Sequence, residues 1–223
     1  MLWLAIVVGL FAAGLSLVLL AYAPRLGYSL REPSETEAER IEQLLEDVGA
    51  PDVETAVRTT TRDGAIECDL LGLPGDRTLV VADAAFEGLE DESLRALVAV
   101  EVERARSRIE IPQALASGVA VAVVAAAYVT SLPVLPTFLV GWAIVLGGIA
   151  LVRRQYYAAD DAAGELVGRT VLCDAIERAA RRRGASLETG RRWHALVDVE
   201  PSVGARIERL RTTPNPQPTE PPN

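Results

Sequence analysis

Residues 94–108 read LRALVAVEVERARSR, and this stretch decides the fold of the chain. Its pattern predicts a helix that mixes valine and alanine with charged side chains. Val100 and Arg104 are four residues apart, so they share one helix face, with Glu101 beside them. The stretch therefore predicts a carboxylate and a guanidinium side by side on a face that also carries a valine.

The spacing on this face is that of the metal-binding helix in zinc peptidases of the H-E-x-x-H type. In that motif the two histidines bind zinc, and the glutamate is the general base for the zinc-bound water. Here the five positions, 100–104, read V-E-V-E-R. Neither valine nor arginine can donate a lone pair to zinc. The chain has one histidine, so no His–His pair can form within it.

That histidine, His194, lies in the segment RRWHALV, which has no metal-ligand spacing. We interpret it as a structural or surface histidine. The alternative is a relocated metal ligand that acts together with Glu101, Glu103 or Asp160.

Four segments extend the pattern along the chain. They are RTLVVAD at 77–83, DESLRALVAVE at 91–101, RRQYYAADDAAGELVG at 153–168 and EPSVGARIERL at 200–210. In order and spacing they resemble the HtpX-like family of membrane zinc metallopeptidases, gluzincins with a cytoplasmic active site. By this resemblance the family's third ligand, a glutamate, falls on Tyr156, and its A-D pair falls on Ala159 and Asp160. A histidine of the last segment falls on Glu200.

The resemblance implies a zinc site whose ligands have been lost. Zinc is the cofactor expected in the family, yet the three ligand positions are Val100, Arg104 and Tyr156 here. Glu101 keeps the general-base position, which is vestigial without a metal-bound water. Asp160 is also retained. We therefore expect no metal and no cofactor in this chain.

Two interpretations of Arg104 remain open. In the first, its guanidinium replaces the charge of zinc and offsets the carboxylates of Glu101 and Asp160, because buried unpaired carboxylates are costly. In the second, RARSR is only a basic cytoplasmic flank of the following apolar segment.

The composition is strongly acidic and lacks lysine. The 223 residues carry 22 basic side chains, all of them arginine, against 31 acidic ones, for a net charge of -9. Proteins of halophiles remain soluble through acidic surfaces of this kind. We therefore expect that the chain comes from a salt-adapted prokaryote, a haloarchaeon. The charge argues against nucleic acid as a partner. Cys68 and Cys173 are predicted to be free buried thiols.

Three stretches are long and apolar enough to cross a lipid bilayer. Residues 1–24 carry no charge and predict an uncleaved transmembrane anchor; a signal peptide cleaved after AYA is the alternative. Residues 111–152 are also uncharged and predict a transmembrane helical hairpin, with helices at 114–130 and 135–152 and a turn at Pro133 and Pro136. Small residues recur four apart in the first two spans, which indicates close helix packing: Ala5, Gly9 and Ala13, and Ala114, Gly118, Ala122 and Ala126.

Arginine distribution predicts the orientation. Arginines follow the first span, precede the second and follow the third, whereas the hairpin turn has no charge. By the positive-inside rule the polar regions are cytoplasmic in a multi-pass protein of the cell membrane.

The polar regions predict a small cytoplasmic domain split by the hairpin. Its first half, 25–110, holds a helix that starts with the capping-box pair Ser34 and Glu37, three strands at 54–61, 65–71 and 78–82, and the degenerate metal helix. Its second half, 153–211, holds helices at 156–183, 187–197 and 203–211. Residues 212–223, with five prolines, predict a disordered tail. The fold class is α+β and mainly helical, with three transmembrane helices and a zincin-like domain.

Three functions are compatible with these features. The first is a catalytically inactive homologue with a binding or regulatory role in membrane protein quality control; its partners would be the lipid bilayer, membrane proteins or an active peptidase paralogue. The second is an active membrane metalloendopeptidase with unconventional ligands or with ligands from a partner. The third is a polytopic membrane protein whose resemblance ends at the fold.

Overall fold

The computed structural model describes residues 2–60, 65–130, 133–184 and 198–212. The predicted helix at 187–197, His194 within it and the tail from residue 213 onward lie outside the described residues.

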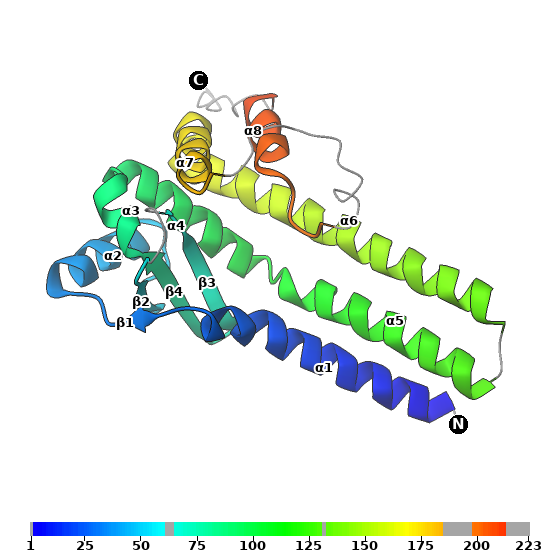
Figure 1. Ribbon diagram of the computed structural model, residues 1–223. Helices are drawn as coiled ribbons and strands as arrows, with labels where there is room; N and C mark the ends of the chain where they lie inside the picture. The colour runs from blue at the N-terminus through cyan, green and yellow to red at the C-terminus, as the bar shows by residue number, and fades with distance from the viewer. Residues whose placement is uncertain (1, 61–64, 131–132, 185–197, 213–223) are drawn as a thin grey trace, which may run out of the picture.

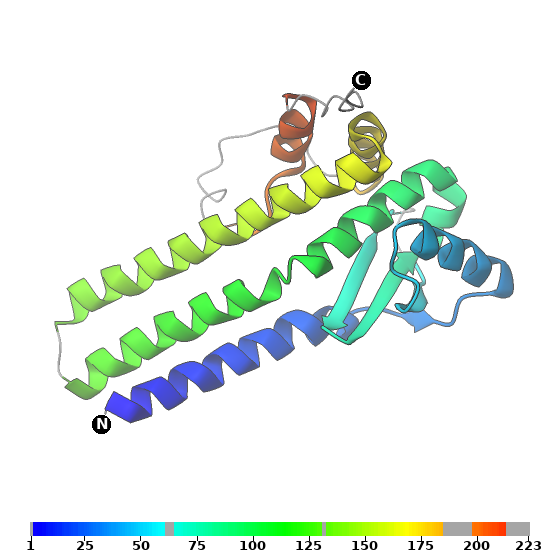
Figure 2. The same ribbon diagram turned by 180° about the vertical axis from the view of Figure 1, so that it is seen from behind.

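Three long helices lie side by side, and a small domain caps one end of them (Figures 1 and 2). The long helices are α1 (Leu2–Leu26), α5 (Glu110–Thr130) and α6 (Val134–Val167). Each is long and apolar enough to cross a membrane by length and composition. The expectation of a mainly helical membrane protein with a small sheet is therefore confirmed.

Helices α1 and α5 approach each other through small residues. A methyl group added at Gly9 would lie 2.5 Å from the Cβ of Ala122, and one added at Gly118 would lie 2.5 Å from the Cβ of Ala13. Such contact leaves no room for a larger side chain at either glycine. It confirms the small-residue spacing as a packing signal and explains how two helices associate where lipid provides no hydrophobic driving force.

The domain contains one sheet of four strands. Its order is β1 (Leu30–Arg31), β2 (Glu54–Arg58), β4 (Asp76–Ala82), β3 (Cys68–Leu73), with β2 and β4 parallel and the other pairs antiparallel. Strand β2 ends at Arg58 and not at 61 as predicted, because its parallel partner β4 ends opposite it at Ala82. Strand β3 starts at Cys68 and not at 65. The two-residue strand β1 was not predicted, since so short a segment has no readable alternation.

Helices α2 (Glu35–Asp47), α3 (Asp83–Gly88) and α4 (Asp91–Arg106) pack with the sheet. The capping box is present at the start of α2: the Ser34 hydroxyl accepts from the Glu37 amide, and the Glu37 carboxylate accepts from the Ser34 amide. The apolar stripe of α2 is buried as expected, at Ile41, Leu44 and Leu45. Helix α4 lies between the sheet and α6 (Figure 1).

Helix α6 is longer than the sequence analysis predicts. It continues past residue 152 without a break and ends at Val167; Gly168, with φ 92°, separates it from α7 (Arg169–Arg182). Thus no boundary lies between the predicted helices at 135–152 and 156–183, because charge at Arg153 ends an apolar run without ending the backbone hydrogen bonding. Helix α8 (Val203–Thr212) packs on α7 and α6. The third span is therefore one rigid rod that carries Tyr156 and Asp160 alongside α4.

Candidate functional site

One face of α4 lines a polar cavity of about 90 Å³ beneath the edge strand β3. The face consists of Leu97, Val100, Glu101 and Arg104, which recur at helical spacing. Opposite them lie Cys68 and Asp69 of β3, Glu200, and Arg206 of α8. Helix α4 thus opens onto a cavity bounded by charged side chains.

Arg104 is bonded on three sides. Its Nη1 donates to Glu101 Oε1 at 2.7 Å, and its Nη2 donates to Glu200 Oε1 at 3.4 Å. The guanidinium carbon lies 4.7 Å from the centre of the Tyr156 ring, an arrangement typical of a cation–π contact. Only 16% of the side chain is exposed, against 49% for Arg106. This geometry contradicts the interpretation of Arg104 as a solvated basic flank.

A second arginine neutralises Asp160. Arg206 donates from Nε and Nη2 to the two carboxylate oxygens of Asp160, at 2.8 and 2.7 Å. The Asp160 side chain is 1% exposed and that of Arg206 is 6% exposed. Such a bidentate pair satisfies both ions away from water. Arg104 therefore interacts with Asp160 through charge without a direct contact, and the hydrogen-bonded partner of Asp160 comes from α8.

Glu200 connects the two arginines. Besides its bond to Arg104, its Oε1 lies 3.6 Å from Arg206 Nη1, and 57% of its side chain is exposed. We call the set Glu101, Arg104, Tyr156, Asp160, Glu200 and Arg206 the polar centre. It joins α4, α6, α8 and the segment before α8 in one network.

Burial shapes the electrostatics of the polar centre. Removal from water raises the pKa of Glu101 to about 7; Arg104 acts in the opposite direction, and Asp69 adds to the rise. Burial alone would lower the pKa of Arg104, but the carboxylates of Glu101 and Glu200 outweigh it and raise that pKa. Burial also raises the pKa values of Cys68 and Asp69 across the cavity. The thiol is therefore a weak nucleophile.

The residues at the three positions that the resemblance assigns to zinc ligands do not fit zinc. Val100 is 2% exposed and packs in the apolar core. Arg104 brings a fixed positive charge to the same face, and the Tyr156 ring lies against that charge. Within the described residues, no three His, Cys, Asp or Glu side chains are grouped to hold a metal ion. Cys68 and Cys173 are free, as expected; Cys173 is buried and Cys68 is half-buried.

The structure brings together most of the residues that the sequence singles out. Glu101, Arg104, Tyr156 and Asp160 converge, whereas Val100 contributes to the core and to the cavity wall. Arg206 was missed. Its available signal is the segment EPSVGARIERL, in which Arg206 follows Glu200 by six residues.

Comparison with known proteins finds no family model and no curated protein that matches the sequence. Among solved structures, the crystal structure of S. mikatae Ste24p matches with a TM-score of 0.67 at 16% identity, over 94% of this chain. The chain therefore shares the fold of the matched part of Ste24p. It spans 57% of the length of Ste24p. At this identity the similarity concerns the fold alone, and the chemistry of the site must be argued from its own residues.

Proposed function

We propose that this protein is a pseudopeptidase of HtpX-like descent that binds membrane proteins without cleaving them. The carrying observation is the placement of the Arg104 guanidinium. It lies at a ligand position of the degenerate motif and bonds Glu101, the residue that would serve as general base. A cation that belongs to the chain itself thereby replaces the cation that an active relative would bind.

This arrangement lacks two functions that peptide hydrolysis by a gluzincin requires: activation of a water molecule and polarisation of the scissile carbonyl. A gluzincin activates water on zinc and polarises the scissile carbonyl with the same ion. Arg104 can stabilise negative charge, but it cannot lower the pKa of a water as a Lewis acid does. Glu101 is engaged by Arg104, and its pKa of about 7 leaves about half of it protonated at neutral pH. The polar centre is therefore suited to structural support and recognition.

The proposed setting is the cell membrane, with the domain and the polar centre in the cytoplasm. The arginine distribution supports this orientation. In that position the protein would act in membrane protein quality control, either by holding a membrane protein or by associating with an active peptidase paralogue. A role without catalysis requires no resident cofactor.

Metal content and cleavage test the proposal directly. Purified protein is analysed for zinc by mass spectrometry after incubation with the ion, and is then assayed on casein, with Glu101→Gln as the control. We expect less than one zinc ion per protein molecule. We also expect that any residual casein cleavage is the same in the natural protein and in Glu101→Gln. Stoichiometric zinc, or casein cleavage lost in Glu101→Gln, would show instead a metalloendopeptidase with unconventional ligands.

A restoring variant tests the scaffold. Val100→His, Arg104→His and Tyr156→Glu together supply the three donors of the family pattern. We expect this variant to bind zinc that the natural protein does not retain. Equal zinc content in both proteins would contradict the assignment of these positions.

A further inference from the structure

The polar cavity lies between α4 and β3, and each of these elements is joined to a different membrane helix. Val100, Glu101 and Arg104 line the cavity from α4, and Cys68 and Asp69 line it from β3. The cavity holds only about 90 Å³, so a small change in the distance between α4 and β3 decides how accessible it is. Whatever fixes that distance also controls access to the polar centre.

Helix α4 is joined to the membrane helix α5 by a short connection. Only Ser107, Arg108 and Ile109 separate the end of α4 from the start of α5. Arg108 has a φ of 50°, in the left-handed region that favours glycine. Its amide donates to the carbonyl of Ala105 at 3.2 Å, and its carbonyl accepts from the amide of Ile111 at 3.0 Å. A connection this short leaves α4 little freedom to move relative to α5.

Strand β3 is joined to the membrane helix α1 by three side chains at and just after the end of α1. All three donate hydrogen bonds to the hairpin of β3 and β4: Tyr22 to the Asp76 carboxylate at 2.9 Å, Arg25 to the Thr78 hydroxyl at 2.9 Å and to the Leu71 carbonyl at 3.2 Å, and Tyr28 to the Asp69 carboxylate at 3.1 Å. We call Tyr22, Arg25 and Tyr28 the α1 attachment. Because Asp69 also lines the cavity, the α1 attachment reaches the cavity wall itself.

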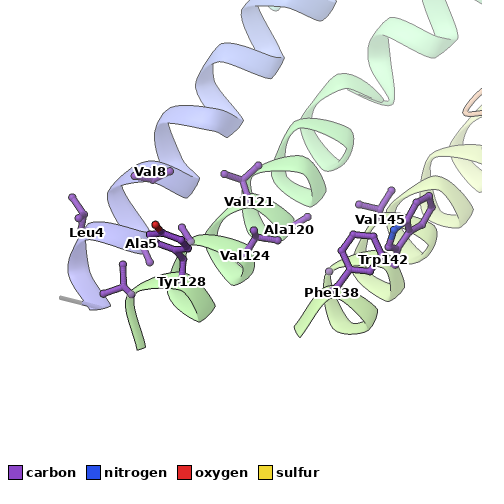
Figure 3. A pocket seen from close by; sticks show the side chains of 13 residues that line it. Leu4, Ala5, Val8, Ala120, Val121, Val124, Tyr128, Phe138, Trp142 and Val145 are labelled. Carbon is purple, nitrogen blue, oxygen red and sulfur yellow. The ribbon is translucent and has the colours of Figure 1, made fainter. Parts of the chain in front are cut away.

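In the membrane, α1 is positioned by α5. A Cβ at Gly9 of α1 would lie 2.5 Å from the Cβ of Ala122 and 2.9 Å from the carbonyl oxygen of Gly118, both on α5. A hollow of about 600 Å³ lies among the three membrane helices, with side chains of α1 and α5 on one side and Phe138 and Trp142 of α6 on the other (Figure 3). The hollow leaves room beside α1, so its position depends on the contact with α5.

These links form a ring of elements around the cavity (Figure 1). Helix α5 is joined to α4, α4 faces β3 across the cavity, β3 is held by the α1 attachment, and α1 packs on α5. Helix α1 is continuous from Gly9 to Arg25, a rise of roughly 24 Å at about 1.5 Å per residue. A shift of α1 at Gly9 is therefore carried along one helix to the α1 attachment.

We propose that the packing of α1 on α5 in the membrane controls the opening of the polar cavity. Close packing holds β3 near α4 and keeps the cavity closed, whereas displacement of α1 from α5 draws β3 away from α4 and opens it. The two sites are coupled because both depend on one contiguous set of packed elements. The consequence for function rests on the proposed binding role: the state of the membrane helices would regulate access of a bound protein segment to the polar centre.

The two cysteines provide a reporter and its control. Cys68 lines the cavity and is half-buried, whereas Cys173 is buried in the apolar core. The full-length protein in phosphatidylcholine nanodiscs is treated with iodoacetamide, and alkylation of each cysteine is followed by peptide mass spectrometry. Alkylation that becomes faster at Cys68 alone reports opening of the cavity, because reaction requires access to the thiol.

Two glycines of α1 provide matched variants. Gly9→Ala places a Cβ 2.5 Å from an atom of α5, so α1 must shift, whereas a Cβ at Gly14 meets nothing within 4 Å. We expect Gly9→Ala to raise the alkylation rate of Cys68 about fivefold or more, and Gly14→Ala to leave it unchanged. Gly118→Ala makes an equally close contact from the α5 side, at 2.5 Å, and should act like Gly9→Ala.

Removal of the α1 attachment tests the route of the coupling. Tyr22→Phe, Arg25→Lys and Tyr28→Phe together remove two hydroxyl donors and the guanidinium, and they keep the positive charge at the membrane boundary. In this triple variant, Gly9→Ala and Gly14→Ala should give equal alkylation rates at Cys68.

Three outcomes would contradict this coupling. Equal rates at Cys68 in Gly9→Ala and Gly14→Ala, with the α1 attachment intact, show that the cavity does not respond to the membrane contact. A difference between them that persists undiminished in the triple variant places the route elsewhere. An equal rise at Cys173 shows that the whole domain has loosened. None of these measurements depends on zinc content or cleavage, so failure here is distinguishable from failure of the proposed function.

Discussion

The membrane helices and the small domain differ in what holds their parts together. Helices α1 and α5 pack through glycine and alanine. The two backbones are so close that a Cβ added at Gly9 would lie 2.5 Å from the Cβ of Ala122. The domain has an apolar core, and buried ion pairs of arginine add to it, most deeply the pair Asp160–Arg206. In lipid, apolar side chains gain little by leaving their surroundings, so shape decides association. In the domain, buried carboxylates demand partners.

The largest effect is expected from the buried pair. Arg206→Ala leaves the Asp160 carboxylate, 1% exposed, without its bidentate donor. We expect a loss of about 3–5 kcal/mol in the free energy of unfolding. Denaturant unfolding of the protein in detergent micelles, followed by circular dichroism, measures it.

Arg211→Ala on the same helix provides the control. Its ion pair with Glu177 is 60% exposed on the arginine side, so its loss should cost less than about 1 kcal/mol. Equal losses in the two variants would refute the central place of the Asp160 pair.

The next effect is a dependence of stability on pH. The pKa of Glu101 is about 7 in the folded protein against an ordinary value of 4.5, so the folded state holds more protons within that interval. Stability should therefore fall as pH rises from 4.5 through 7, by up to about 3 kcal/mol. Glu101→Gln should remove this slope, whereas Glu92→Gln, at an exposed position of α4, should retain it. Parallel slopes in both variants would assign the dependence to another group.

Loss of Arg104 should cost about 2 kcal/mol. Arg104→Ala removes the bonds to Glu101 and Glu200 and the contact with Tyr156, but Glu101 can escape part of the penalty by binding a proton. Arg104→Lys should recover part of the loss, since it keeps the charge without the planar fork. Arg95→Ala is the control, because Arg95 lies on the same helix as Arg104 and its 3.6 Å ion pair is with Asp47 of α2. If Arg104→Ala leaves the free energy of unfolding unchanged, the hypothesis that the Arg104 guanidinium replaces the charge of zinc is wrong.

The smallest effect is expected in the membrane. Gly9→Leu forces α1 away from Ala122 and the carbonyl of Gly118, and should cost about 1–2 kcal/mol. Gly14→Leu on the same helix meets nothing within 4 Å and should be neutral. Thermal unfolding in micelles compares the two variants; identical midpoints would mean that α1 and α5 do not depend on this close contact.

Local features of the fold were readable from the sequence. The three apolar runs, the capping box at Ser34 and the small-residue spacing in the spans rest on residues a few positions apart, and all three are present. Helix ends were less readable. Charge at Arg153 suggested a boundary that the helix ignores, and the actual break at Gly168 depends on a positive φ that only the folded chain reveals.

The sequence by itself determined that valine and arginine stand at positions 100 and 104, where the H-E-x-x-H spacing would have histidines, because residue identities are local facts. Only the tertiary structure decided which charged groups meet around these positions. Arg104 meets Glu200 from 96 positions away, and Arg206 meets Asp160 from 46 positions away. Both pairings arise because α6 continues past the membrane boundary and α8 folds back onto it. Which distant charged side chains pair depends on how the helices pack, and the spacing of residues along the chain does not encode that packing.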